Sequence, residues 1–576
     1  MSLTRVGVFI EEKAVRALWE GGHNVFQLYI REVFEHLGIP FLTVHHCADK
    51  ILNDLDILIV AVASEEEETE EAIWNFAEKG GTVIAYGGLA GLKDRIGCEE
   101  SGETGAGYAK LAPLFNKQHA MRYLQASPWK IKSDYAGAVT GVGSLHIGGP
   151  NGEHSGAALI HAQVGSGRID RWAVDPITMI VQFQQGSKPV IADGIPAEDG
   201  SASVNDGILK ADDVYEMDWS NDRLQTETGA PYFAYPYADL WREVIISHLL
   251  QRAVEQGGVL PFMDYWPEGI PSVALISHDS DENMDDHAIT ALSVLEELGI
   301  TSTWCMMEPG YSQAVYEKVK ADGHELAFHY NSLDLDNGVW SKEEFRRQIS
   351  WLHQSISSTD VASNKNHYTR IEGWGELFSW CEEFGIASDQ TRGPSKRGNI
   401  GFLFGTCHPY FPIAWVDEQN RLYDVVEISF LTQDLEEPSL ADSSVIIPFL
   451  DQVALVKGVA HFLFHQRHIH HSEEVRSALR KVVTEARKRG FAFWTGDEIQ
   501  QWERYKRKLV LKALNTNIFE VCYEIQTDDL KSNFEPVVWL PIPHGDCTTY
   551  PDAEIRFGVK CKKAIFRQET TLPTIL

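Results

Sequence analysis

Short apolar runs alternate with helical apolar spacing along the first 90 residues. Four runs are typical of buried strands and one segment has the apolar spacing of a helix: strands at 5–10, 41–44, 55–61 and 82–86, helix at 26–37. The acidic segment from Glu65 leads into a further helix that ends near residue 80. Strands that alternate with helices predict an open, doubly wound, flavodoxin-like parallel sheet.

The pattern changes between about residues 100 and 235. Gly, Ser and Asp interrupt short apolar runs such as 157–160 and 169–174, which predicts strands and turns. Residues 238–255 have the spacing of an amphipathic helix, and the Gly- and Pro-bearing stretch that follows predicts a linker. We therefore place an α/β domain over 1–100, and over 101–260 a β-rich segment and linker helix that complete the N-terminal half.

A second unit begins with the apolar strand run 272–277. Further strand runs follow at 325–328 and 458–465, and a basic amphipathic helix over 498–508 is expected to close the unit. The last segment has alternating runs at 518–523 and 555–559 with Pro-bearing turns between them, which predicts a small all-β domain over 515–576.

Charge and cysteine usage exclude several classes of protein. Fifty basic residues against 83 acidic ones give a net charge of −33, which repels nucleic acid. No run approaches the length of a membrane span, so no membrane partner is expected. The eight cysteines include no CxxC pair, and the N-terminus has no signal-peptide pattern, so we expect a reducing, cytoplasmic location.

Ionisable residues gather at the ends of the predicted strands in the second unit. Asp279 and Asp281 follow the strand at 272–277, and His329 ends the strand at 325–328. Two-residue periodicity places His461 and His465 on one face of a later strand. Carboxylates and imidazoles at successive strand ends are typical of a metal or acid–base site, because the loops there carry the chemistry of barrel enzymes.

The order and spacing of these motifs resemble the polysaccharide deacetylase family (NodB-type, carbohydrate esterase family 4). Five stretches carry the resemblance: Ser277-His278-Asp279 with a second carboxylate at Asp281, Gly323-His324-Glu325 through His329, Lys365-Asn366-His367-Tyr368, Asp389, and Leu463-Phe464-His465. It covers roughly residues 270–500. The resemblance implies a distorted (β/α) barrel over 270–508.

The resemblance also implies catalytic roles in a metal-dependent amide hydrolysis. Asp279 would be the general base and His465 the general acid that protonates the departing amine. Lys365 would stand where the family has an arginine that orients the base, and Asp389 where it has its fourth motif. The backbone N–H of Tyr368 would help to bind the oxyanion.

The same resemblance implies a divalent metal ion, with Zn as the first expectation and Co, Ni or Mn as alternatives. Asp281 and His329 would hold it. The position four residues after His329, where the family has another histidine, is a leucine. His367 is our first choice for the third ligand, with Asp334 or Asn331 as alternatives. In a further alternative, Asp279 itself ligates the metal and no separate base remains.

The turn after the strand at 82–86 reads Gly87-Gly88-Leu89-Ala90-Gly91. This strand-turn arrangement resembles the class I glutamine amidotransferase-like fold, which has a nucleophilic cysteine between glycines there. Leu89 takes that position and has no thiol or hydroxyl to activate. We therefore expect a scaffolding or ligand-shaping domain.

Together these features predict a hydrolase that acts on carbon–nitrogen bonds other than peptide bonds. The expected reaction removes an acetyl or related acyl group from an N-acetylated sugar or similar amide, so the expected partner is a carbohydrate or small amide. The alternative is a catalytically degenerate homologue that binds carbohydrate or serves in assembly. A homo-oligomer is left open. Metal content distinguishes the two functions, because the hydrolase requires an ion.

Overall fold

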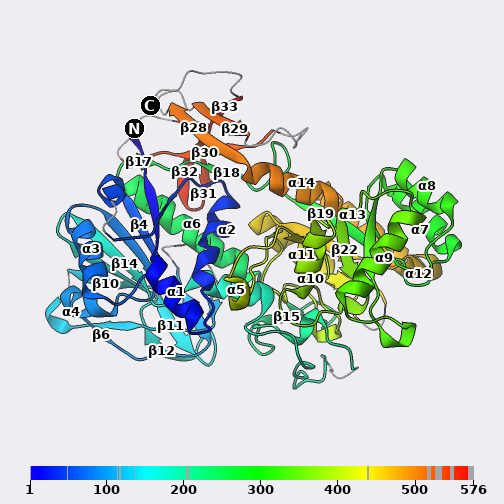
Figure 1. The fold of residues 1–576 in the computed structure, drawn as a ribbon, viewed down its shortest axis with the longest axis horizontal. Coiled ribbons are helices and arrows are strands. Elements are labelled where there is room, and N and C mark those ends of the chain that lie inside the picture. The colour runs from blue at the N-terminus through cyan, green and yellow to red at the C-terminus, as the bar shows by residue number, and fades with distance from the viewer. Residues whose placement is uncertain are drawn as a thin grey trace.

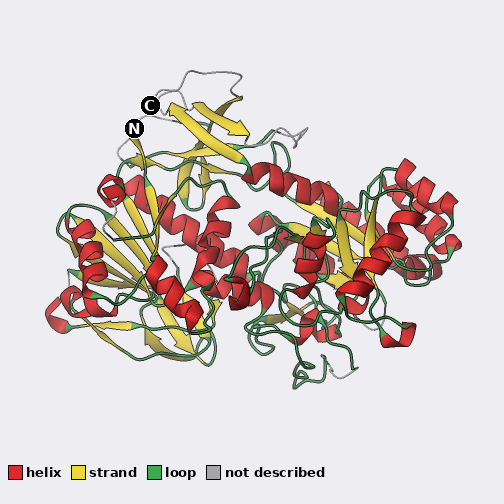
Figure 2. Cartoon of the chain, in the orientation of Figure 1, coloured by secondary structure: helices red, strands yellow, loops and turns green. Residues whose placement is uncertain are grey.

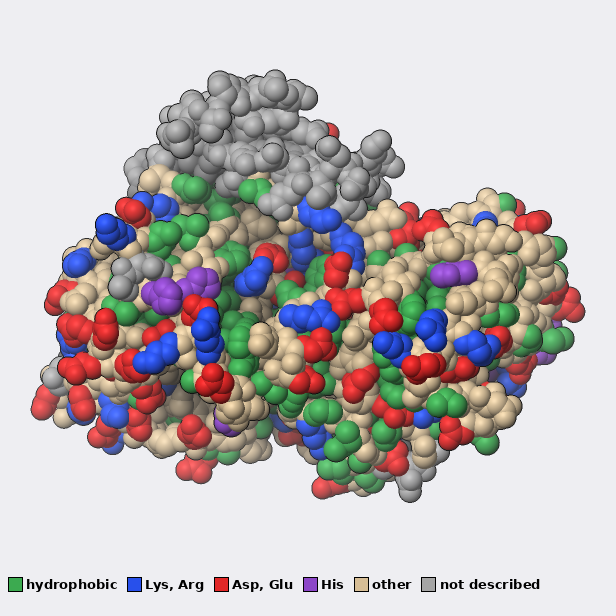
Figure 3. Space-filling model, in the orientation of Figure 1, with side chains coloured by type: hydrophobic (Ala, Val, Ile, Leu, Met, Phe, Trp, Pro, Cys, Tyr) green, Lys and Arg blue, Asp and Glu red, His purple; other side chains and the backbone are tan. Residues whose placement is uncertain are grey.

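Two large sheets, each flanked by helices, make up most of the molecule (Figure 1, Figure 2). The computed structural model describes residues 2–47, 50–112, 115, 119–135, 138–202, 207–437, 440–515, 520–525, 535–544 and 550–568. Acidic and basic side chains are interspersed over the face shown in Figure 3. Within the described ranges, no helix has the length and apolar character needed to cross a membrane.

The N-terminal sheet joins strands from both parts of the first 260 residues. Its order is β10-β13-β14-β5-β4-β2-β3, parallel from β14 to β3 and antiparallel at β13 and β10. The parallel α/β arrangement expected from the sequence is therefore present. The strands are β2 (Val6–Ile10), β3 (Leu42–Val44), β4 (Ile57–Val62), β5 (Thr82–Tyr86), β10 (Val139–Val142), β13 (Leu159–Val164) and β14 (Gly167–Trp172).

The helices of this half differ from the predicted ones in detail. The segment predicted as one helix over 26–37 is a 3₁₀ turn followed by a short α-helix. The segment 101–260 also contains α5, which begins at Pro176 with Asp175 accepting two backbone hydrogen bonds as its N-cap. The helices are α1 (Glu12–Glu20), α2 (Ile30–Glu35), α3 (Glu67–Glu78), α4 (Lys93–Ile96), α5 (Pro176–Gln185) and α6 (Tyr237–Glu255).

Helix α6 was predicted to be amphipathic but is buried over most of its surface. Several polar side chains on this helix have buried partners. The Arg242 guanidinium donates to Asp239 at 3.2 Å, and His248 lies 2.9 Å from the buried carboxylate of Asp170. Paired polar groups of this kind can be buried at low cost.

The turn after β5 holds Leu89 in a left-handed conformation, with φ of 60°. Its side chain is buried in an apolar cluster against the sheet. The turn thus presents an aliphatic side chain that packs inward. The likeness of this half to the amidotransferase-like fold stays a prediction.

The second large sheet is a curled, parallel half-barrel. Its order is β24-β23-β22-β21-β20-β19-β26-β25, and β27 also pairs with β19. Because the strands are parallel, their carboxyl ends meet at one edge. They are β19 (Val273–Asp279), β20 (Thr303–Met306), β21 (Glu325–Tyr330), β22 (Ser363–Asn366), β23 (Ser388–Asp389), β24 (Val426–Glu427), β25 (Thr432–Gln433), β26 (Val459–Leu463) and β27 (Ala492–Phe493).

Helices surround this sheet, with α14 following its last strand (Figure 1). Helix α14 begins with a capping box between Thr495 and Glu498, which satisfies backbone donors at its first turn. The helices are α7 (Asp285–Leu298), α8 (Gln313–Ala321), α9 (Lys342–Ser355), α10 (Glu376–Glu383), α11 (Ile446–Val456), α12 (Gln466–His471), α13 (Glu473–Lys488) and α14 (Gly496–Arg507).

The C-terminal strands form two small sheets at the upper edge of Figure 1. The predicted strand at 555–559 is two strands, because the chain turns at Phe557 and Gly558, which both have positive φ. Residues 518–519 of the other predicted strand lie outside the described residues. The strands are β18 (Phe262–Met263), which pairs with β30, and β28 (Leu509–Asn515), β29 (Glu520–Ile525), β30 (Val538–Pro541), β31 (Glu554–Arg556), β32 (Val559–Lys563) and β33 (Ile565–Gln568).

A buried ionic contact joins α14 to α2 of the N-terminal half. Arg507 Nη2 lies 2.5 Å from Glu32 Oε1, and the same guanidinium also pairs with Glu503. The carboxylate of Glu32 accepts a further hydrogen bond from the backbone N–H of Phe411 at 3.3 Å. Glu32 and Glu503 are each 1% exposed, so this contact holds the two halves together in a region that excludes water.

Arg507→Ala should lower the free energy of unfolding by about 3–5 kcal/mol, because it removes the arginine that pairs with the buried carboxylate of Glu32, whereas Glu503 keeps Lys506 as a partner. The measurement is the shift of the urea midpoint. Arg480→Ala removes an exposed pair with Glu297 and serves as the control, with a far smaller shift. Equal midpoints for the two variants would contradict the assignment of this contact as an anchor between the halves.

Candidate metal and acid–base site

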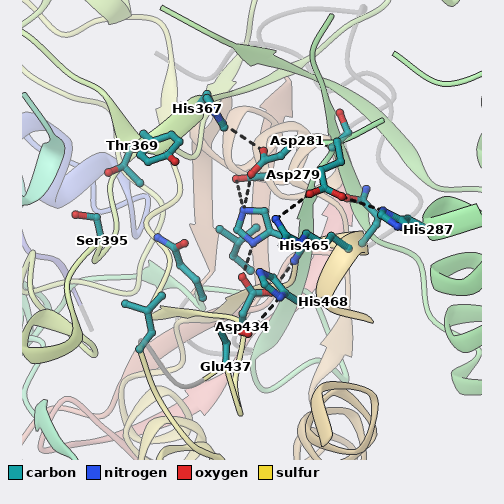
Figure 4. Close-up of a pocket in the computed structure, with 18 of the residues that line it drawn as sticks. Asp279, Asp281, His287, His367, Thr369, Ser395, Asp434, Glu437, His465 and His468 are labelled. Atoms are coloured by element: carbon teal, nitrogen blue, oxygen red, sulfur yellow. Dashed lines mark hydrogen bonds and ion pairs between the residues drawn. The ribbon is translucent and has the colours of Figure 1, made fainter. Parts of the chain in front are cut away.

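A cavity of about 530 Å³ opens at the carboxyl edge of the curled sheet. Asp279, Asp281, His367 and His465 all line it, and Figure 4 shows their side chains converging. Its wall also includes Ser201 and Lys210 from the N-terminal half. The sequence-predicted residues at the ends of β19, β22 and β26 are thus brought to one place.

Asp281, His329 and His367 form a compact cluster. Asp281 Oδ1 lies 3.3 Å from His329 Nε2 and 3.2 Å from His367 Nδ1, and the two imidazole nitrogens are 3.2 Å apart. His329 is the penultimate residue of β21 and is fully buried, and His367 follows β22 directly. The sheet curl brings together residues that are up to 86 positions apart.

The tautomer of His329 follows from its partner. His329 Nδ1 lies 2.8 Å from the backbone carbonyl of Lys365, and a carbonyl can only accept a hydrogen bond. Nδ1 therefore carries the proton, and neutral His329 has its lone pair on Nε2, the atom that faces Asp281 and His367. This is the arrangement by which a second hydrogen bond orients a metal-ligating imidazole.

The three atoms fit a divalent cation. Four ligands at about 2.0–2.1 Å from a tetrahedral Zn lie about 3.3–3.4 Å from one another, close to the separations in this cluster. One carboxylate oxygen and two imidazole nitrogens also form a donor set that suits first-row divalent ions. The remaining coordination position would face the cavity, where a substrate has access.

Asp281 is ionised in this setting. Burial opposes its charge, but His465 above all, together with the nearby imidazoles of His329 and His367, outweighs burial and holds the pKa of Asp281 well below its usual range. An ionised carboxylate is the form that a cation binds.

Asp279 lies beside the cluster and is held by a buried lysine. Lys365 Nζ is 3.5 Å from Asp279 Oδ1 and donates to Ser277 Oγ at 2.6 Å. The Ser277 hydroxyl in turn donates to His461 Nε2 at 2.8 Å, because His461 Nδ1 donates to the carbonyl of Ile428 at 3.1 Å. Lys365 is fully buried, so this chain of contacts fixes the position of its ammonium group.

The charge of Asp279 depends on that lysine. Burial raises the pKa of Asp279, but Lys365 above all, with His329 and His465, outweighs burial and lowers it below its usual value. Oδ1 is buried and accepts no hydrogen bond from the described residues. Asp279 is therefore an ionised carboxylate whose Oδ1 lies beside the Lys365 ammonium, while the residue lines the cavity.

His465 is held by a carboxylate that the sequence analysis did not find. Its Nδ1 donates to Asp434 Oδ2, while its backbone N–H donates to Asp434 Oδ1 at 2.8 Å. His465 Nε2 lies 3.4 Å from Asp281 Oδ2 and 3.9 Å from Asp279 Oδ2 (Figure 4). Burial opposes protonation, but Asp434, Asp281 and Asp279 outweigh it and raise the pKa of His465 to about 10. The imidazole of His465 is thus doubly protonated and positively charged at neutral pH.

The other predicted residues lie at different distances from the cavity. Tyr368 lines it, is half-exposed, and has a left-handed backbone with φ of 55°. Asp389 does not line it: its carboxylate is fully buried and accepts hydrogen bonds from Asn364 at 2.7 Å and from Thr391 at 2.8 and 3.0 Å. Asp389 is thus placed to support the strand ends, not to touch a substrate.

The alternative metal ligands lie outside the cluster. Asp334 has a side chain that is 91% exposed and lies 3.9 Å from Arg370. Asn331 donates to Asp336 at 3.0 Å and accepts from the backbone of Leu333. Neither lines the cavity, whereas His367 does. Ser280 accepts a hydrogen bond from the backbone of Met307 at 3.2 Å, so its hydroxyl is engaged elsewhere.

Comparisons with known proteins give distant structural neighbours. No family model matches the chain, and no curated protein matches it. Solved polysaccharide deacetylases are among its structural neighbours. A structure assigned as a polysaccharide deacetylase of Mycobacterium smegmatis has 14% identity and a TM-score of 0.32, over 43% of this chain and 96% of that one.

Two further neighbours are as distant. The Xyl-CE4 domain of a multidomain xylanase, from the hindgut metagenome of Trinervitermes trinervoides, has 13% identity and a TM-score of 0.25, over 40% of this chain and 91% of that one. A β-galactosidase of Bacillus circulans sp. alkalophilus has 12% identity and a TM-score of 0.25, over 30% and 29%. Similarity at this level carries no argument about activity.

In the metal-free protein, Asp434→Asn should lower the pKa of His465 by about 1–3, because it removes a negative charge in contact with the imidazole. Histidine-labelled protein titrated by NMR measures this, and the signal missing in His465→Gln assigns the resonance. Glu437→Gln, which alters a carboxylate paired with His468 at 3.2 Å, is the matched control and should leave the His465 signal nearly unchanged. An unchanged pKa in Asp434→Asn would contradict the Asp434–His465 contact.

Proposed function

We propose that this protein is a metal-dependent hydrolase that removes an acetyl or related acyl group from an N-acetylated sugar or a similar amide. One observation carries the proposal: Asp281 and His367, two of the three clustered residues, line the same cavity as Asp279, whose pKa is lowered, and His465, whose pKa is raised. Amide hydrolysis needs a group that takes a proton and a group that gives one.

Asp281, His329 and His367 would hold the ion. When bound, a divalent ion polarises a carbonyl and lowers the pKa of bound water. Asp281 supplies the negative charge, and the carbonyl of Lys365 keeps His329 in the tautomer that binds. His367 is the third ligand in this proposal because its Nδ1 faces the same point.

Asp279 would act as the base and His465 as the acid. The carboxylate of Asp279 lines the cavity and would accept the proton of the attacking water, and Lys365 keeps this carboxylate ionised before the reaction. His465 carries its proton on Nε2, since Nδ1 is engaged by Asp434, and gives it to the departing amine. The two groups thus stand in opposite protonation states, as the acid–base pair requires.

The cavity suits a polar substrate. Hydroxyl, amide and charged side chains line it beyond the acid–base groups, among them Thr369, Ser395, Lys396 and Gln433. Such side chains can hydrogen-bond the hydroxyl groups of a sugar. The backbone N–H of Tyr368 is our candidate for binding the oxyanion.

His367→Ala and Asp334→Ala should separate the candidate third ligands. His367→Ala should lose ion binding at the Asp281 cluster, with an affinity loss of 10-fold or more by analogy with the removal of a supporting group. Asp334→Ala should keep it. The readout is competitive titration of stripped protein with Zn²⁺ and a chelating dye. The same affinity in both variants would remove His367 from the site.

His465→Ala should lower kcat for acetate release by about 10²–10⁴-fold, because it removes the acid. His468→Ala, on helix α12 three residues after His465, is the control and should have a much smaller effect. The assay measures acetate released from N-acetylglucosamine oligosaccharides and from small N-acetylated amides. Bound metal must be unchanged in His465→Ala.

The assay also separates the enzyme from a binding module. Acetate release that depends on Asp279, His329 and His465 supports the hydrolase. If protein that holds the ion binds carbohydrate but releases no acetate, the hydrolase proposal is wrong and the catalytically degenerate, carbohydrate-binding homologue is favoured. If the Asp281 cluster binds no divalent ion, the proposal of a metal-dependent hydrolase is wrong.

A further inference from the structure

A second group of imidazoles lies at the edge of the same cavity. His287 is on the first turn of α7, and His470 and His471 end α12. One nitrogen from each ring lies within 4.8 Å of one from each of the others. In Figure 4, His287 and His367 lie on opposite sides of Asp281, so this group is separate from the Asp281 cluster.

The three rings pack against one another, face to edge in the two pairs that include His471 and tilted in the His287–His470 pair. Ring centroids are 4.7 Å apart for His287 and His470, 5.0 Å for His287 and His471, and 4.8 Å for His470 and His471. His287 is 7% exposed, whereas His471 is exposed to solvent. One side of the group is therefore enclosed by protein, and an ion could enter from the other.

A hydroxyl group fixes the tautomer of His470. Thr290 Oγ1 donates to the backbone carbonyl of Asp286 at 2.9 Å, and a carbonyl can only accept. Thr290 Oγ1 must therefore accept from His470 Nδ1, which lies 2.8 Å away. Neutral His470 is left with its lone pair on Nε2. A hydrogen bond of this kind to the nitrogen that does not bind is how ligating imidazoles are oriented.

A carboxylate stands beside the group. Glu282 Oε2 lies 3.8 Å from His287 Nδ1, and Glu282 Oε1 pairs with Arg467 at 2.8 Å. Three imidazoles with a nearby carboxylate form a donor set that suits Zn²⁺ or another first-row divalent ion.

We propose that His287, His470 and His471 form a second divalent-cation site, independent of the hydrolase function proposed above. The ion would link α7 to α12. Helix α7 follows the loop that carries Asp281, and α12 begins directly after His465. The site would therefore tie together the two elements that position the metal ligand and the acid of the first site.

Zn²⁺ stoichiometry tests this proposal in full-length protein without a histidine tag. After chelator treatment, reloading with Zn²⁺ and removal of free ion, elemental analysis should give two equivalents for wild type. His471→Ala and His329→Ala should each hold one, and the double variant none. His353→Ala, on α9 and outside each of the clusters, is the control and should hold two.

Cobalt isolates the second site. Co²⁺ bound to His329→Ala should give visible absorption from imidazole ligation, and adding His471→Ala should abolish it. Zn²⁺ should also raise the Tm of His329→Ala, and the rise should vanish in the double variant, because an ion stabilises only the fold that binds it. Asp281→Asn replaces His329→Ala as the background if that variant does not fold.

Two results would overturn the proposal. One is a second equivalent that survives in His471→Ala but disappears in His468→Ala, which would place it at Asp434, His465 and His468 instead. The other is no ion bound by His329→Ala under conditions that load the wild type. If the wild type binds no ion at the Asp281 cluster but binds one that is lost in His471→Ala, the proposed hydrolase is refuted and the second site is supported.

Discussion

The buried pair of Asp279 and Lys365 is the contact on which the rest of this site depends. A carboxylate at this depth is tolerated only with a compensating charge, because an unpaired buried ion costs several kcal/mol. Lys365 lies on β22 and Asp279 on β19, with β20 and β21 between them. Three steps across a flat sheet span about 14 Å, more than a lysine side chain can reach. Only a curled sheet allows the contact, and the same curl brings His329, His367 and Asp281 together.

The cavity belongs to the whole chain and not to the curled sheet alone. Lys210 lies in the segment between α5 and α6, forms a backbone bridge with Arg370 and lines the cavity beside Tyr368. In the same segment, Asp212 and Asp213 pair with Lys396 at 3.1 and 2.8 Å. The N-terminal half therefore shapes the wall opposite the acid–base groups. Such contacts restrict which molecules can enter the cavity. The candidate acid–base groups lie at the strand ends.

The sequence predicted well which residues stand at the strand ends, but it did not predict the residues that contact them. Asp281, His329 and His465 each follow a continuous apolar strand run, and such runs are the strongest local signal of a parallel sheet. Asp434 follows β25, which has only two residues, and its φ is 33°, so no periodic pattern marks it. Its partner His465 lies 31 positions away. Lys210 was missed for the same reason, because contacts that depend on tertiary packing leave no trace in local spacing.

Lysine at position 365 is held in place by its surroundings. A lysine lacks the planar fork with which an arginine clamps both oxygens of a carboxylate, so it cannot orient Asp279 alone. Here Ser277 Oγ accepts a hydrogen bond from the Lys365 ammonium group. His461, whose Nδ1 donates to the carbonyl of Ile428, fixes the direction of the Ser277 hydroxyl. The ammonium group is thereby held by Ser277 on one side and lies 3.5 Å from Asp279 Oδ1 on the other. His461 therefore contacts Ser277 without lining the cavity, and the strand face that it shares with His465 is used at two depths: His461 is buried beneath the site and His465 lies at the cavity wall.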